Sequence, residues 1–234
     1  MVMANLVWVR FRSNGRAFNR LIIRLSLLVM NLTVGGLRAG EVDHGVLIPQ
    51  VRCAGAPDQS YALYLPPGYN ETRKWPILYC FDPGARGRLP VERFQAAAER
   101  LGYIVVGSYN SRNGDMEIAN RAASAVLRDT GLRLKLDEKR RYAMGLSGGA
   151  RVACLVAREY GLAGVVANAA GFPGGVTPAE VPFAFFGAVG REDFNYIEMR
   201  GVQKDLQTRP FPHRLAVFEG THELLPAALA GQAL

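Results

Sequence analysis

Short apolar segments alternate with amphipathic segments along most of the chain. The apolar segments are mostly uninterrupted, which is typical of strands that are buried on both faces of a parallel sheet. A polar turn between two earlier apolar segments predicts a hairpin over residues 46–51 and 60–65. The predicted core strands span residues 76–81, 103–108, 141–146, 163–168, 183–189 and 214–218.

Between these strands, apolar residues recur at the three- and four-residue spacing of a helix face. Strands that alternate with helices, joined by right-handed crossovers, predict an α/β fold with a mostly parallel central sheet and helices on both faces. No internal repeat or linker divides residues 40–234, so we expect one domain there. The predicted helix faces consist of Val91, Phe94, Ala98 and Leu101; of Ile118, Ala122, Ala125 and Val126; and of Val152, Leu155 and Val156.

The formal net charge of +8 raises the question of a nucleic-acid partner. Six of the 28 basic residues, and none of the 20 acidic residues, lie in residues 1–39. The rest of the chain is therefore close to neutral. We expect no nucleic-acid partner for the domain, and the sequence does not indicate an oligomeric state.

Residues 1–39 have the three parts of a secretory signal peptide: an arginine-rich stretch up to Arg24, an apolar run over residues 25–37, and a small residue at Ala39. The apolar run is shorter than the roughly 20 residues that cross a bilayer, so no stable membrane span is predicted. We expect removal of the signal peptide and export to the periplasm or the medium. A basic amphipathic helix, or a start codon placed too far upstream, are the alternatives.

The three cysteines, Cys53, Cys80 and Cys154, have no CxxC spacing. They predict neither a disulfide framework nor a zinc site, and Cys80 and Cys154 fit apolar positions of a strand and a helix. The sequence also has no HExxH, no P-loop lysine motif and no GxGxxG opening a helix. We therefore predict no metal and no cofactor.

A glycine-flanked serine lies where a predicted strand passes into a predicted helix. Residues 142–149 read YAMGLSGG and contain GxSxG, formed by Gly145, Ser147 and Gly149. A sharp reversal at this point strains the serine backbone and leaves no room for side chains two positions away. It also places the helix N-terminus beneath the serine hydroxyl, where negative charge is favoured. This pattern predicts a nucleophile, and the alternative is a glycine-rich turn with an incidental serine.

A serine nucleophile needs a base, most often a histidine. In an open parallel sheet, functional residues gather at the carboxyl ends of the strands. His44 precedes the first strand and His213 begins the last one, whereas His222 follows the last strand. We therefore predict His222 as the base and His213 as a surface histidine near the opposite edge.

A carboxylate must orient the histidine and stabilise its charged form. Glu192 and Asp193 both follow the strand predicted over residues 183–189. We choose Asp193 because Gly190, three residues earlier, allows a turn from which a short side chain can reach the histidine. Glu192 stays as the alternative, and a solvated acidic loop or the cap of a helix beginning near Asn195 are the structural interpretations.

These segments resemble the α/β-hydrolase superfamily, and within it the secreted esterases grouped with polyhydroxybutyrate depolymerases and feruloyl esterases. The resemblance runs from about Tyr61 to the C-terminus. It implies a triad of Ser147, Asp193 and His222 and a two-step ester hydrolysis through an acyl-enzyme. The motifs that carry it are YCFDPGARG (79–87), SYNSRNG (108–114), the serine turn, GREDFNY (190–196) and FEGTHE (218–223).

Attack on an ester carbonyl creates an oxyanion that needs two aimed N–H donors. The amide of Gly148, which follows the serine, is the first predicted donor. The second is expected from the loop after the first core strand, where the His-Gly usual in this family is replaced by Asp82-Pro83. Because Pro83 has no N–H, we expect Gly84 or Ala85 to donate.

The link between the strands over residues 163–168 and 183–189 is short, which leaves room for a minimal lid or none. An open cleft would accept a small-molecule or polymeric ester. Tyr109, Asn110 and Arg112 follow a strand at the carboxyl edge and are predicted to contact the substrate. A serine peptidase or acyltransferase would use the same triad, and a catalytically inactive binding module is the remaining alternative.

Overall fold

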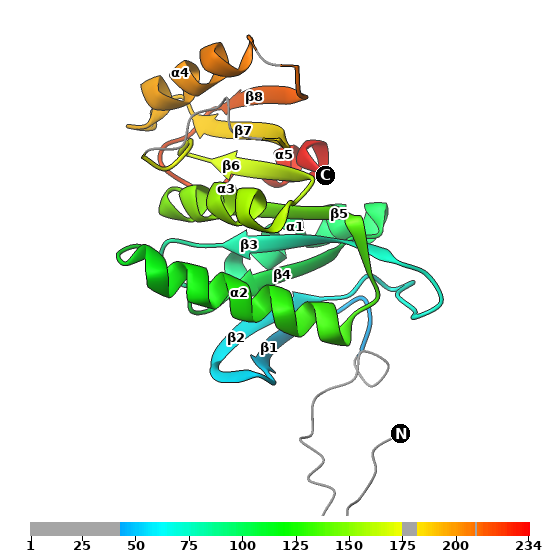
Figure 1. Ribbon diagram of the computed structural model, residues 1–234. Helices are drawn as coiled ribbons and strands as arrows, with labels where there is room; N and C mark the ends of the chain where they lie inside the picture. The colour runs from blue at the N-terminus through cyan, green and yellow to red at the C-terminus, as the bar shows by residue number, and fades with distance from the viewer. Residues whose placement is uncertain (1–42, 175–181, 209) are drawn as a thin grey trace, which may run out of the picture. The chain divides into compact units, whose positions relative to one another are not determined.

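The structure is a computed structural model that describes residues 43–174, 182–208 and 210–234. Within these residues, eight strands form one sheet (Figure 1). They are β1 (Leu47–Cys53), β2 (Ala56–Tyr64), β3 (Trp75–Phe81), β4 (Ile104–Ser108), β5 (Leu136–Leu146), β6 (Gly164–Asn168), β7 (Ala184–Gly190) and β8 (His213–Phe218). Their order is β1-β2-β4-β3-β5-β6-β7-β8. Strand β2 is antiparallel to both neighbours and all other pairs are parallel, which confirms the predicted sheet.

Helices cover both faces of this sheet, as predicted (Figure 1). Helices α2 (Met116–Arg133), α3 (Gly148–Tyr160) and α4 (Tyr196–Leu206) pack on one face. Helices α1 (Arg88–Leu101) and α5 (Ala227–Ala233) pack on the other. None of the helices in the described ranges is long and apolar enough to cross a membrane.

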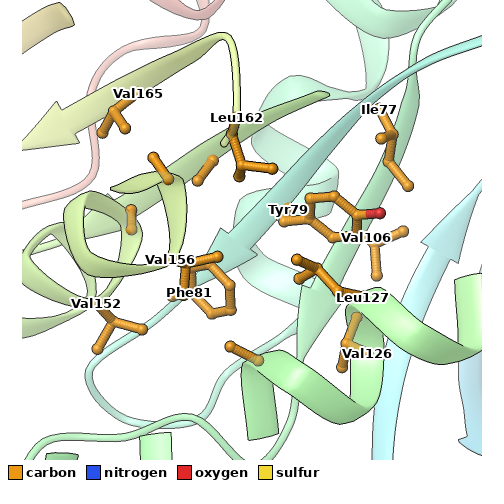
Figure 2. Close-up of a cluster of buried hydrophobic side chains, with 14 of the residues drawn as sticks. Ile77, Tyr79, Phe81, Val106, Val126, Leu127, Val152, Val156, Leu162 and Val165 are labelled. Carbon is orange, nitrogen blue, oxygen red and sulfur yellow. The ribbon is translucent and has the colours of Figure 1, made fainter. Parts of the chain in front are cut away.

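The buried side chains form one cluster on each face because successive strand residues point in opposite directions. Figure 2 shows Ile77, Tyr79 and Phe81 of β3 facing the two helices α2 and α3. Leu78 and Cys80, between them in sequence, belong to the cluster under α1. Full burial of each large apolar side chain contributes about 2 kcal/mol. The helix residues that meet β3 in Figure 2 are Val126, Leu127, Val152 and Val156.

Two predicted helix positions are wrong. Leu101 and Ile118 are each 44% exposed, although the apolar spacing placed them on buried faces. Leu101 is the last residue of α1, and in α2 the neighbouring Ala119 and Ala123 are buried instead. A helix rich in alanine offers more than one apolar stripe, so spacing alone does not determine which stripe meets the sheet.

Several expectations concern residues that the structure does not describe. The predicted signal peptide, residues 1–39, lies outside the described ranges. Residues 175–181, in the short link between β6 and β7, also lie outside the described ranges. The predictions of export and of a minimal lid therefore stay predictions.

All three cysteines are free and buried. Burial raises the pKa of Cys53 to about 12, and it raises the pKa of Cys80 and Cys154 further above the usual range of a thiol. Since the thiolate is the reactive form, these side chains act as small apolar core residues.

A buried carboxylate ties the β1–β2 hairpin to helix α2. Asp129, 3% exposed, accepts hydrogen bonds from the Tyr61 hydroxyl and from the backbone N–H of Ala54, both at 2.7 Å. Arg133 Nε lies 2.7 Å from Asp129 Oδ2, the same oxygen that accepts from Tyr61. Burial and the bond to Asp129 raise the pKa of Tyr61, which keeps its hydroxyl protonated and able to donate. Opposite charges and matched donors thus compensate the desolvation of the carboxylate.

We predict that Asp129→Ala lowers the free energy of unfolding by about 3 kcal/mol, because it removes the acceptor of the buried Tyr61 hydroxyl and of the Ala54 N–H, and also the carboxylate that pairs with Arg133. Urea denaturation followed by circular dichroism would measure the change. Asp58→Ala removes a solvent-exposed partner of Arg121 and serves as the control, with little expected change. Equal effects of the two substitutions would contradict the importance of the buried network.

Candidate functional site

Ser147 occupies the turn between β5 and α3 with φ 54° and ψ −121°. A non-glycine residue in this region is strained by about 1–3 kcal/mol and needs support from its surroundings. Its backbone N–H donates to the carbonyl oxygen of Asn168 at 2.8 Å, and its own carbonyl oxygen accepts from Ala150 N at 2.9 Å. These bonds hold the turn, so the side chain projects from the carboxyl edge of the sheet at the start of α3.

The two flanking glycines are required by close backbone contacts. A Cβ on Gly145 would lie 2.0 Å from the carbonyl carbon of Gly149. A Cβ on Gly149 would lie 2.0 Å from the carbonyl oxygen of Phe81, at the end of β3. Any side chain at either position would push α3 away from the sheet. The structure thus gives the physical reason for the GxSxG pattern.

His222 and Asp193 form a hydrogen-bonded pair at the same edge of the sheet. The Nδ1 atom of His222 lies 2.9 Å from Asp193 Oδ1, and the ring donates because an ionised carboxylate can only accept. The Asp193 side chain is fully buried, whereas that of His222 is 24% exposed. Asp193 Oδ1 also accepts from Asn195 N at 2.8 Å. The second oxygen, Oδ2, is buried without a hydrogen-bond partner among the described residues.

The remaining titratable candidates lie elsewhere. Glu192, the alternative to Asp193, has an exposed side chain. His213 begins β8, at the opposite edge of the sheet from His222, and its Nδ1 lies 3.1 Å from the carbonyl oxygen of Phe211. The structure therefore pairs His222 with Asp193 and keeps His213 apart from both.

Asn168 links the serine turn to the loop that carries His222. Its backbone oxygen accepts from Ser147 N, as described above, and its side chain is fully buried. The side-chain oxygen accepts from Leu225 N at 2.6 Å, and Nδ2 donates to the carbonyl oxygen of Glu223 at 3.2 Å. One residue at the end of β6 thus holds the segment just after His222 beside Ser147. Sequence reasoning missed it, although an asparagine that ends an apolar strand was a visible signal.

Among the residues that the structure describes, no hydrogen bond joins Ser147 Oγ to the His222 ring. Such a bond is often long before substrate binds and shortens in the complex. The backbone connections through Asn168 place the two residues at one edge, which is the arrangement that this shortening requires.

An exposed aromatic residue covers one face of the histidine. The rings of Phe194 and His222 are stacked, with centroids 4.0 Å apart and planes at 27°. Phe194 is 75% exposed, and Ile197, in the first turn of α4, is 77% exposed. Exposed apolar side chains beside a reactive group can bind an apolar part of a substrate. The sequence analysis did not identify either residue.

Two of the predicted substrate contacts, Tyr109 and Asn110, make hydrogen bonds within the chain. The Tyr109 hydroxyl donates to the carbonyl oxygen of Pro49 at 2.7 Å. The Asn110 side chain accepts from Ser60 N at 2.8 Å and donates to the carbonyl oxygen of Asp58 at 3.1 Å. Their polar atoms hold the β1–β2 hairpin because this hairpin lies beside the loop after β4. Arg112 is exposed, and its backbone forms an isolated bridge with Gly84.

Two cavities lie away from Ser147. The first, of about 230 Å³, is lined by Leu78, Tyr142, Val166 and Phe186 and reaches His213 at the amino end of β8. The second, of about 270 Å³, lies between the β1–β2 hairpin and α2. Neither includes a residue of the predicted triad.

Comparison with solved structures identifies the fold. A ferulic acid esterase matches with a TM-score of 0.57 and 17% identity, covering 70% of this chain and 85% of that one. An S-formylglutathione hydrolase from Staphylococcus aureus matches with a TM-score of 0.56 and 16% identity, covering 75% and 86%. A feruloyl esterase module from Clostridium thermocellum, complexed with sinapinate, matches with a TM-score of 0.59 and 16% identity, covering 76% and 82%.

The chain therefore has the α/β-hydrolase fold, as the motifs predicted. Its order of strands and the position of the serine turn between β5 and α3 belong to that fold. No protein-family model matches the sequence, and no curated protein matches it. At these identities the likeness shows the fold alone.

The hydrogen bond between His222 and Asp193 predicts a strongly deshielded imidazole N–H resonance in the proton NMR spectrum, because a proton shared with a buried carboxylate loses electron density. Asp193→Ala should abolish the resonance, whereas Glu192→Ala should leave it in place. A resonance that survives Asp193→Ala, or disappears with Glu192→Ala, would contradict this pairing.

Proposed function

We propose that this chain is a serine hydrolase that cleaves carboxylic esters through Ser147, His222 and Asp193. The observation that carries the proposal is the arrangement at one sheet edge. A strained serine begins a helix at the carboxyl edge of the sheet, and a histidine at the same edge is bound through Nδ1 to a buried aspartate. This combination of nucleophile, base and orienting carboxylate defines acyl transfer by a triad.

The first half of the reaction forms an acyl-enzyme. Ser147 Oγ attacks the ester carbonyl carbon, and its proton passes to Nε2 of His222. The carbonyl π electrons move to the oxygen, and the Gly148 N–H donates to the resulting oxyanion. When the intermediate collapses, the C–O bond to the alcohol breaks and the alcohol takes the proton from His222.

The second half repeats these steps with water. His222 removes a proton from the attacking water, and a second tetrahedral intermediate forms. When this intermediate collapses, the bond to Ser147 Oγ breaks, His222 returns the proton to Oγ and the carboxylic acid is released. Asp193 keeps the Nδ1–H tautomer in place and stabilises the imidazolium in both halves. Its complete burial strengthens this electrostatic interaction.

The apolar surface beside His222 supports an ester with an apolar group. Phe194, which stacks on the His222 ring, offers exposed apolar contact area to a small-molecule ester or to one unit of a polymeric ester. One of the similar structures is a feruloyl esterase module complexed with sinapinate, an aromatic acid. We therefore include aromatic esters among the substrates to be tested.

We predict that Ser147→Ala lowers the turnover of 4-nitrophenyl acetate by at least about 10³-fold and abolishes labelling by a fluorophosphonate, since both require the hydroxyl. His222→Ala should have a comparable effect on turnover. His213→Ala is the matched control and should keep most of the activity, because His213 lies at the opposite edge.

Full hydrolysis by the Ser147→Ala variant would remove the serine from the mechanism. Turnover of a peptide nitroanilide in preference to esters would favour a peptidase, and transfer to an added alcohol in preference to water would favour an acyltransferase. Absence of both turnover and labelling in the wild-type protein would favour a binding module.

We further propose that the protein is exported by its leader, on the basis of the arginine-rich and apolar segments of residues 1–39. Expression of the full chain in a bacterium should yield an exported form that begins near residue 40, as measured by mass spectrometry of the N-terminus. A variant that lacks residues 1–39 should stay in the cytoplasm. An exported form that retains these residues would contradict cleavage.

A further inference from the structure

The two amides expected to complete the oxyanion site are already engaged, which corrects that prediction. Gly84 N donates to Asp82 Oδ1 at 2.8 Å, and Ala85 N donates to the Asp82 carbonyl oxygen at 3.1 Å. Asp82 is 1% exposed and also binds Arg86 through both carboxylate oxygens, at 2.9 and 3.0 Å. A buried carboxylate needs these donors, so the loop turns its N–H groups inward.

The loop after β4 reaches the serine turn in their place. The backbone N–H of Asn113 donates to the carbonyl oxygen of Pro83 at 2.9 Å, and Arg112 forms a bridge with Gly84. These contacts join the loop after β4 to the loop after β3. The backbone of Asn113 is therefore held in position, and its side chain takes no part in these contacts.

The Asn113 carboxamide lies directly against the residue that follows the serine. A Cβ built on Gly148 would lie 1.8 Å from Asn113 Oδ1, 2.8 Å from Cγ and 3.3 Å from Nδ2. The carboxamide thus occupies the space that a side chain at residue 148 would fill, next to the predicted first oxyanion donor. A side chain at residue 148 would therefore displace the Asn113 carboxamide.

The same carboxamide has no hydrogen bond to another described residue, in contrast to that of Asn110. Its oxygen and nitrogen exchange places by a half-turn about the Cβ–Cγ bond, and the two atoms are assigned from hydrogen-bond partners. Without such a partner, either end can face Gly148. A negative charge that develops beside Gly148 N favours the orientation in which the NH₂ group faces it.

We propose that Asn113 is a catalytic residue whose Nδ2–H donates to the oxyanion together with the Gly148 N–H. This inference rests on the proposed function. The proposal accounts for Asp82-Pro83 at the position where the resembling family has His-Gly. The loop after β3 then has no backbone N–H directed at the oxyanion, and the loop after β4 supplies a side-chain donor instead. The loop after β3 then has a structural role, in which it supports the backbone of Asn113.

The first test substitutes the carboxamide. Asn113→Ala should lower kcat for 4-nitrophenyl acetate by about 10²–10³-fold with KM changed little, since the donor acts on charge that exists only in the transition state. Asn113→Asp keeps the shape but loses the donor, and should lose at least as much activity. Glu117→Ala, an exposed substitution four residues away with no assigned role, is the control and should retain wild-type activity.

A transition-state analogue separates this role from a structural one. An aryl trifluoromethyl ketone forms a hemiketal oxyanion on Ser147, so its affinity should fall in Asn113→Ala by a factor similar to the loss in kcat/KM. Thermal unfolding should be unchanged. A rise in KM alone, or unchanged ketone affinity, would overturn the assignment to the oxyanion and indicate substrate contact or loop support.

A double-mutant cycle tests the contact with Gly148. Gly148→Ala should reduce kcat strongly in the wild-type background because the added methyl group displaces the carboxamide. In the Asn113→Ala background it should cause little further loss, since the space is then free. Additive losses would overturn the proposed contact.

The outcomes also separate this inference from the proposed function. Wild-type activity in Asn113→Ala, together with inactivity of Ser147→Ala, would reject Asn113 and leave the serine hydrolase intact. Activity that survives in Ser147→Ala would reject both.

Discussion

The close approach of β3, β5 and α3 at the serine turn is the constraint on which the site depends. Gly145, Gly149 and the carbonyl oxygen of Phe81 lie so near one another that no Cβ fits between them. This contact lets the chain reverse at Ser147 with φ 54°, a conformation that a serine would not adopt in an unconstrained chain. The strain is maintained because α3 and β5 are embedded in the core, where Val152 and Val156 pack against β3. Backbone sterics at two glycines thus determine the position of a hydroxyl.

The parallel sheet extends this constraint to distant segments. Strands β5, β6, β7 and β8 are neighbours with the same direction, so the segments that follow them meet at one edge. Asn168 uses that proximity, because its backbone supports Ser147 while its buried side chain holds the backbone just after His222. The loop after β7 contributes Asp193 to the same edge. The arrangement at this edge therefore depends on hydrogen bonds between main chain and side chains as well as on the hydrogen bond between His222 and Asp193.

Asp82 determines where N–H groups of the loop after β3 point. A buried carboxylate at the end of β3 needs several donors, and it takes them from the backbone N–H of Gly84 and from the backbone and guanidinium of Arg86. Those backbone groups are then directed into the loop and away from the serine. The loop after β4 is bound to this structure through Asn113 and Arg112, which brings an otherwise free carboxamide onto Gly148. The loop after β3, whose N–H groups bind Asp82, therefore also supports the backbone of Asn113.

The fold class, most of the core strands and the pairing of His222 with Asp193 could be predicted from the order of apolar runs and turns along the chain. Apolar runs give the strands, and residues that follow parallel strands share one edge, so Ser147, Asp193 and His222 could be placed together from their positions alone. The tertiary structure decided which alanine stripe of α2 is buried, and that Tyr109 and Asn110 hold the hairpin. It also decided that Asn168 and Asn113 face the serine turn. The physical reason is that a strand pattern specifies where backbone segments end, whereas the direction of a loop side chain depends on which donors and acceptors of other segments meet it after folding.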